Sequence, residues 1–77
     1  MSSEVVACLL LVVKMGKEHE VAEKIKRIED VVEVLIVYGQ WDVLIRIETE
    51  ALGKLDYIVT EIRRIDGVEQ TTTLIAS

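Results

Sequence analysis

Apolar residues recur along this chain with two different periods, which divide it into strands and helices. Residues 5–13 are apolar on both alternating faces, as in a strand that is buried on both sides. In residues 17–29 the apolar positions lie three or four apart, which predicts a helix. A second helix is predicted at residues 51–65, followed by Asp66-Gly67 as its stop signal. The remaining apolar runs are rich in β-branched residues and are predicted strands, at residues 31–38, 43–47 and 68–76.

The second half of the chain repeats the first at a distance of 37 residues. Gly16-Lys17 recurs as Gly53-Lys54, and Arg27-Ile28 recurs as Arg64-Ile65. The chain is therefore two copies of one strand–helix–strand unit, in the order β-α-β-β-α-β. Two such units with right-handed crossovers predict an α+β, ferredoxin-like fold, in which a four-stranded antiparallel sheet carries two helices on one face.

Two helices can cover only one face of this sheet, although the first strand is apolar on both. A chain of 77 residues buries only about 60% of its unfolded surface, yet 51% of these residues are hydrophobic and the mean hydropathy is +0.35. The uncovered face is then an apolar patch, and a dimer packed sheet against sheet in a dimeric α/β-barrel-type assembly, or edge to edge, would bury it. In the second strand, alternation predicts two sets of side chains on opposite faces: Val31, Leu35 and Val37 on one, and Val32, Val34 and Ile36 on the other.

Charge and cysteine content exclude several classes of function. The net charge of −5 and the pI of about 4.8 argue against direct nucleic-acid binding, which depends on Lys and Arg. The single cysteine, Cys8, lies in an apolar run and is expected to be a reduced core residue, in a cytoplasmic protein. The longest apolar run, residues 5–13, is too short to span a membrane as a helix, and the flank at residues 1–4 lacks the basic residue of a secretory signal.

Catalytic and metal-binding motifs are absent from the sequence. One cysteine cannot form a metal-transfer loop, and the chain has no asparagine for an acylphosphatase-like site. The basic runs at residues 24–27 and 63–64 lie among acidic residues, so we expect solvated helix faces with i,i+4 pairing. His19, near a helix start, is expected to be merely exposed. We therefore predict no catalytic residue, no metal site and no cofactor.

Two constellations remain as candidates for ligand binding. The first is Tyr38-Gly39-Gln40-Trp41-Asp42, which separates two strands and is typical of a tight hairpin. The second is Thr71-x-Thr73 in the last strand, where alternation places both hydroxyls on the same face. Taken singly, the first is ordinary turn chemistry and the second contains ordinary strand formers.

The order of these features resembles the ligand-binding and oligomerisation domain of Lrp/AsnC regulators, often called the RAM domain. The resemblance implies a single, stand-alone RAM domain over residues 1–77, without the helix-turn-helix of the family's regulators. It further implies dimers that assemble into rings such as octamers or decamers, with an amino-acid effector between dimers at the hairpin corner. The resemblance covers nearly the whole chain and rests on residues 16–18, 31–34, 38–42 and 66–73.

The chemistry of the hairpin suits such an effector. Asp42 offers a charged acceptor for an ammonium group, and backbone N–H groups around Gly39–Trp41 offer donors for a carboxylate. Thr71 and Thr73, from the same or a neighbouring subunit, are expected to complete the polar shell, and Trp41 to pack on the ligand or on a contact between dimers. The leading hypothesis is a non-enzymatic, amino-acid-binding oligomer that acts with DNA-binding Lrp/AsnC-type regulators. The alternatives are a small enzyme of the dimeric α+β barrel type and a purely structural oligomerisation module.

Overall fold

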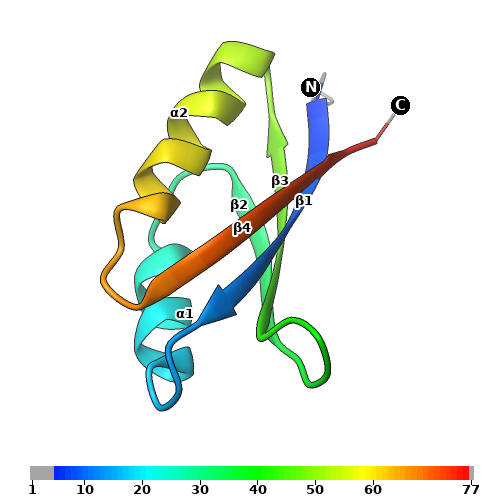
Figure 1. Ribbon diagram of the computed structural model, residues 1–77. Helices are drawn as coiled ribbons and strands as arrows, with labels where there is room; N and C mark the ends of the chain where they lie inside the picture. The colour runs from blue at the N-terminus through cyan, green and yellow to red at the C-terminus, as the bar shows by residue number, and fades with distance from the viewer. Residues whose placement is uncertain (1–4, 77) are drawn as a thin grey trace.

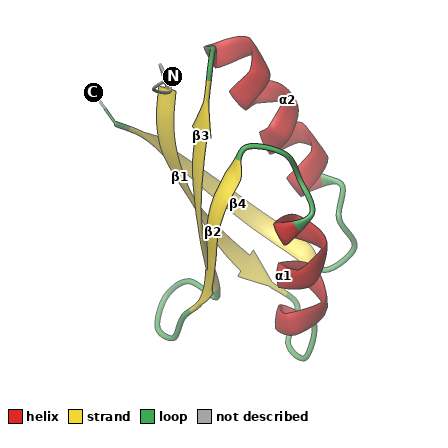
Figure 2. Cartoon of the chain, turned by 180° about the vertical axis from the view of Figure 1, so that it is seen from behind, coloured by secondary structure: helices red, strands yellow, loops and turns green. Residues whose placement is uncertain are grey.

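The computed structural model describes residues 5–76, and these form one antiparallel sheet with two helices on one face (Figures 1 and 2). The sheet order is β2-β3-β1-β4, so β1 and β3 are central and β2 and β4 are edges. The predicted ferredoxin-like βαββαβ fold is confirmed. The flank at residues 1–4 that entered the argument on a secretory signal lies outside the described residues. In chain order the elements are β1 (Val5–Val13), α1 (Glu18–Lys26), β2 (Val31–Ile36), β3 (Val43–Thr49), α2 (Leu52–Arg63) and β4 (Val68–Ile75).

The core lies between the two helices and the central strands. Alternate residues of β1 and β3 point toward the helices and are buried, whereas their neighbours on the other face are only half-buried. Leu9 pairs with Ile45 across the two strands, and both side chains are fully buried. The helices contribute the stripes that the helical period predicted, which include Val21, Ile25, Leu55, Ile58 and Ile62.

Both helices end earlier than the sequence predicted, at equivalent places in the repeat. After each helix, backbone N–H groups donate to the carbonyl three residues earlier in the chain. One residue with positive φ follows, Asp30 at 75° after α1 and Gly67 at 105° after α2. Asp30 is held there by contacts of its own: Thr49, which is only 2% exposed, donates its hydroxyl to Asp30 Oδ2 at 2.8 Å, and Lys54 Nζ lies 3.5 Å from the same oxygen. These turns explain why residues 27–30 and 64–67 are not helical.

The predicted face of Val31 is wrong, because β2 contains a bulge. Val31 pairs with Ile47, but the next register pair is Glu33 with Arg46, so Val32 is an extra residue. The bulge returns Val31 to the same face as Val34, against the core.

The uncovered sheet face is largely apolar, as predicted, but it also carries an ionic group. Half-buried β1 side chains lie in its middle, next to the exposed Leu35 and Leu74. Toward β2 the guanidinium of Arg46 pairs with the carboxylates of Glu33 and Glu48. The β1 side chains on this face are Val6, Cys8, Leu10 and Val12.

Candidate functional site

A cavity of about 320 Å³ lies at the hairpin corner, between the start of α1 and the loop that joins β2 to β3. Both views of the chain place this loop and the β1–α1 turn at the same end of the sheet (Figures 1 and 2). The cavity combines two carboxylates, an imidazole, a phenol and apolar strand residues. Its lining residues are Glu18, His19, Ile36, Val37, Tyr38, Gly39 and Asp42.

One backbone hydrogen bond closes the hairpin below its exposed tip, and a second ties the loop to β1. The Val37 N–H donates to the Asp42 carbonyl at 2.9 Å, and the Asp42 N–H donates to the Leu11 carbonyl at 2.8 Å. Gly39 has a φ of 121°, which side-chain-bearing residues rarely adopt, so the tip needs glycine there. The predicted turn is confirmed, with a longer connection than the predicted strands implied because β2 ends at Ile36.

Asp42 has a structural role beside its candidate role in binding. Its Oδ2 accepts a hydrogen bond of 2.8 Å from the N–H of Val13, a core residue. The β1–β3 ladder ends with the pair Leu11 and Val43, so the carboxylate takes the place of the next backbone acceptor. A carboxylate has about four acceptor sites. Within residues 5–76 the other oxygen, Oδ1, makes no hydrogen bond, which leaves it available to a ligand.

The other loop residues differ in their relation to the cavity. Tyr38 lines it and is 99% exposed, whereas Gln40 and Trp41 are not among its lining residues. Gln40 is exposed and Trp41 is half-buried. A fully exposed tyrosine at a loop tip is a side chain suited to an interface.

Four residues of the cavity were missed by sequence reasoning: Ile36 and Val37 immediately before the predicted turn, and two residues far from it in sequence. Glu18 and His19 lie in the first turn of α1, some twenty positions before the hairpin, and the fold brings them to it. Glu18 Oε1 also accepts a hydrogen bond of 3.1 Å from the Gly16 N–H. No sequence signal linked His19 to the hairpin, because its position next to the loop depends on how α1 packs.

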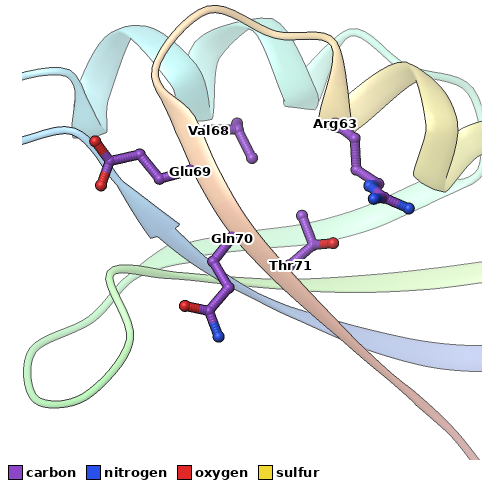
Figure 3. Close-up of a pocket in the computed structure, with 5 residues that line it drawn as sticks. All are labelled: Arg63, Val68, Glu69, Gln70 and Thr71. Atoms are coloured by element: carbon purple, nitrogen blue, oxygen red, sulfur yellow. The ribbon is translucent and has the colours of Figure 1, made fainter.

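Thr71 and Thr73 lie on one face of β4, as predicted, but away from the hairpin. They pair with Leu11 and Leu9 of β1 and point to the helix side of the sheet. Thr71 lines a second cavity of about 330 Å³ with Arg63, Val68, Glu69 and Gln70 (Figure 3). The hairpin and Thr71 thus line cavities at opposite edges of the sheet, whereas Thr73 lines neither of these two cavities. One chain does not bring the two constellations together.

The described residues form neither a metal-binding cluster nor a membrane-spanning helix. Within residues 5–76 no group of three or more His, Cys, Asp or Glu side chains is arranged to hold a metal ion. Neither helix in this range is long and apolar enough to cross a bilayer.

Comparison with known proteins gives consistent matches over almost the whole chain. A family model described as the Lrp/AsnC ligand binding domain matches residues 6–77. The HTH-type transcriptional regulator FL11 of Pyrococcus furiosus is 35% identical over 71 residues, which are 92% of this chain and 47% of that protein. The chain thus spans less than half of the length of this regulator.

Two solved structures match in both fold and length. The crystal structure of FFRP-DM1 superposes with a TM-score of 0.90 and 40% identity, covering 95% of this chain and 99% of that one. The hypothetical protein PHS023 of Pyrococcus horikoshii has a TM-score of 0.88 and 40% identity, covering 95% and 89%.

Proposed function

The chain belongs to the Lrp/AsnC ligand-binding domain family, and on this premise we propose that it is a non-enzymatic oligomer that binds an amino acid. The observation that carries the proposal is the hairpin cavity with Asp42 on its wall. Its volume of about 320 Å³ is at the lower end of the range for small-molecule sites, which fits a ligand the size of an amino acid.

The polar groups of the cavity match the two ends of an amino acid. Asp42 Oδ1 is a charged acceptor for the ammonium, since Oδ2 is occupied by the Val13 N–H. The loop backbone at Gly39 and the ring of His19 offer donors for the carboxylate. The apolar walls, Ile36 and Val37, leave room for an aliphatic side chain.

A protein that shares this fold was crystallised with an amino acid, which supports the proposal. The transcriptional regulator NMB0573 of Neisseria meningitidis was crystallised as a complex with L-Met; it has a TM-score of 0.86 and 13% identity, covering 99% of this chain and 51% of that one. At this identity the likeness is one of fold.

Assembly is the second part of the proposal. The open sheet face carries Leu10, Leu35 and Leu74 among other apolar side chains, and packing it on a second copy would remove these from water. Dimers would then join into rings of the octamer or decamer size that the family resemblance implies. Because the relative FL11 is named a transcriptional regulator, we propose that the oligomer acts in the cytoplasm together with DNA-binding regulators of this family.

The test is an equilibrium binding screen of the purified oligomer against each of the twenty amino acids by calorimetry, with light scattering to measure its mass. Binding of at least one amino acid, weakened in Asp42→Asn, supports the proposal. A well-folded oligomer that binds none of them would instead favour a purely structural module.

A further inference from the structure

Another cavity, of about 170 Å³, lies in the helix layer between the turn that follows α1 and the first part of α2. It is lined by residues 28–30 of the turn and by Lys54, Tyr57, Ile58 and Glu61 of α2. The turn precedes β2 and α2 follows β3, so the cavity lies toward the opposite end of these strands from the hairpin that joins them (Figures 1 and 2). The helices also lie on the opposite side of the sheet from the open face. The cavity is therefore separate from both surfaces of the proposed function.

The cavity combines apolar side chains with an exposed aromatic ring. Ile58 is 3% exposed and Ile28 is half-buried, whereas Tyr57 is 64% exposed. The Tyr57 hydroxyl donates a hydrogen bond of 3.5 Å to Glu61 Oε2. Sites for whole small molecules have volumes of about 300–1,000 Å³. The smaller volume here suits a single side chain from a partner.

The internal repeat places the same geometry at a second position, with different side chains. Exchange of residues that are 37 positions apart gives residues 65–67 of the turn after α2, together with Lys17, Glu20, Val21 and Lys24 at the start of α1. Each set joins the first part of one helix to the turn that follows the other. The molecule therefore offers its own comparison for the charges beside α2.

The charges are balanced beside α1. Lys17 Nζ lies 3.1 Å from Asp66 Oδ2 and 3.9 Å from Glu20 Oε2. Lys24 Nζ lies 3.8 Å from the same oxygen of Glu20. Two lysines of this chain thus neutralise two carboxylates, which shows that the geometry accommodates a cation between two acids.

Two replacements remove this balance beside α2. Glu61 takes the position of Lys24, and Tyr57 takes the position of Glu20. A cation is thereby exchanged for a carboxylate, and a carboxylate for an aromatic ring. One lysine and three carboxylates line this cavity, which leaves a surplus of two negative charges.

The one lysine of this cavity pairs with other acids. Lys54 Nζ lies 3.5 Å from Asp30 Oδ2 and 3.8 Å from Glu50 Oε1. Within residues 5–76 neither Glu29 nor Glu61 makes an ion pair. Both carboxylates are thus available to a cation from outside the chain.

The two turns also approach their helices differently. A Cβ at Gly67 would lie 3.2 Å from both Lys17 Cβ and Val21 Cγ2, so glycine allows this turn a close approach to α1. The equivalent residue, Asp30, carries a side chain, and this side chain accepts a hydrogen bond from Thr49. The turn after α1 therefore lacks the close approach that glycine allows, and the cavity lies beside it.

We propose that this cavity docks an arginine side chain of a basic partner protein. The guanidinium lies between Glu29 and Glu61, as a lysine does between two acids beside α1. Arginine fits better than lysine, because its planar group stacks on an aromatic ring, here Tyr57, and can donate to two carboxylates at once. Its aliphatic stem packs on Ile28 and Ile58.

Charge favours a partner that differs from this chain. Two copies, each with a net charge of −5, repel each other, and this cavity adds to the repulsion because it is itself acidic. A positively charged surface is attracted instead, and complementary charge speeds its association. Arginine is also among the side chains that contribute most to binding at protein interfaces. The partner is thus a positively charged protein surface with an exposed arginine.

The first experiment observes the isoleucine methyl groups of the intact oligomer by NMR. The probe is a five-residue peptide whose only charge is a central arginine. Its ends are blocked, so it offers no free ammonium or carboxylate to an amino-acid site. Matched peptides carry lysine, or the uncharged analogue citrulline, in place of the arginine. We expect the arginine peptide to shift the signals of Ile28 and Ile58 and to leave Ile36 of the hairpin cavity unchanged.

The second experiment titrates the same peptide into charge variants. Glu29→Gln and Glu61→Gln should each weaken it by about 2- to 5-fold, the effect of one exposed ion pair. Asp56→Asn is the control, because Asp56 is an exposed acid of α2 that does not line the cavity. Tyr57→Leu keeps an apolar side chain but removes the ring, so it should reduce the preference for arginine over lysine.

Several results would contradict the proposal. Absent shifts at Ile28 and Ile58, or equal shifts with the citrulline peptide, would overturn the docking of a cation there. Equal affinities of the arginine and lysine peptides would overturn the choice of arginine, and equal losses in Glu61→Gln and Asp56→Asn would overturn the role of Glu61. Shifts of these methyl groups on dilution of the oligomer alone would mean that a second copy fills the cavity.

Discussion

Two substitutions at Asp42 can distinguish its structural role from its proposed role in ligand binding. Replacing it with Ala removes the acceptor of the Val13 N–H and also the charge that faces the cavity. Replacing it with Asn removes only the charge, because the side-chain carbonyl oxygen can still accept that hydrogen bond. The two variants should therefore have the same effect on ligand binding and different effects on stability.

The magnitudes follow from the surroundings of the two atoms. Val13 is 4% exposed, so an unpaired N–H there has little access to water, and Asp42→Ala should cost about 1–3 kcal/mol of unfolding free energy. Asp42→Asn exchanges a charge-assisted hydrogen bond for a neutral one of roughly half the strength, so it should cost less than about 1 kcal/mol. Both should weaken an amino acid by about 10- to 100-fold, the equivalent of one hydrogen bond to a charged group.

The assay is urea unfolding at a fixed protomer concentration, since the stability of an oligomer depends on concentration. Gln40→Ala is a matched control from the same loop, because Gln40 is exposed and does not line the cavity. If Asp42→Ala and Asp42→Asn unfold at the same urea concentration as Gln40→Ala, the structural role of the carboxylate is wrong. If Asp42→Asn binds amino acids like the wild type, its role in the site is wrong.

Three further changes test the turns that hold the repeats together. In Gly67→Ala, the added Cβ would lie 3.2 Å from Val21 Cγ2 at a φ of 105°, so strain and crowding should cost about 2–5 kcal/mol; a loss below 1 kcal/mol in urea unfolding would contradict this. Thr49→Val removes the hydroxyl that donates a hydrogen bond to Asp30 and should cost about 1–2 kcal/mol of unfolding free energy. Thr49→Ser keeps this hydroxyl and should cost less. The hydrogen bond from Lys17 lowers the pKa of the Asp66 carboxyl. The stabilisation from this pair is therefore present above the ordinary aspartate pKa and is lost as pH falls through the lower pKa of the folded state. In an NMR titration, added salt should raise the pKa of Asp66 toward its ordinary value.

The fold was predictable because its strongest signals are local and repeated. Nine apolar residues with two apolar faces predicted a strand away from the sheet edge, and β1 lies between β3 and β4 with one face in the core and the other half-buried. The bulge in β2 was not predictable, because the extra residue is Val32, between other apolar residues. Alternation of apolar and polar positions carries no information where both faces hold valine, so the side of Val31 was assigned wrongly.

The candidate site was predictable only where its residues are neighbours in sequence. Gly39 and Asp42 belong to one loop, and turn chemistry identified both. Arg63 and Arg64 are adjacent and looked alike in the sequence, as parts of one charged helix face. Only the position of β4 beside α2 distinguishes them, because Arg63 lines a cavity together with Thr71 and Arg64 does not.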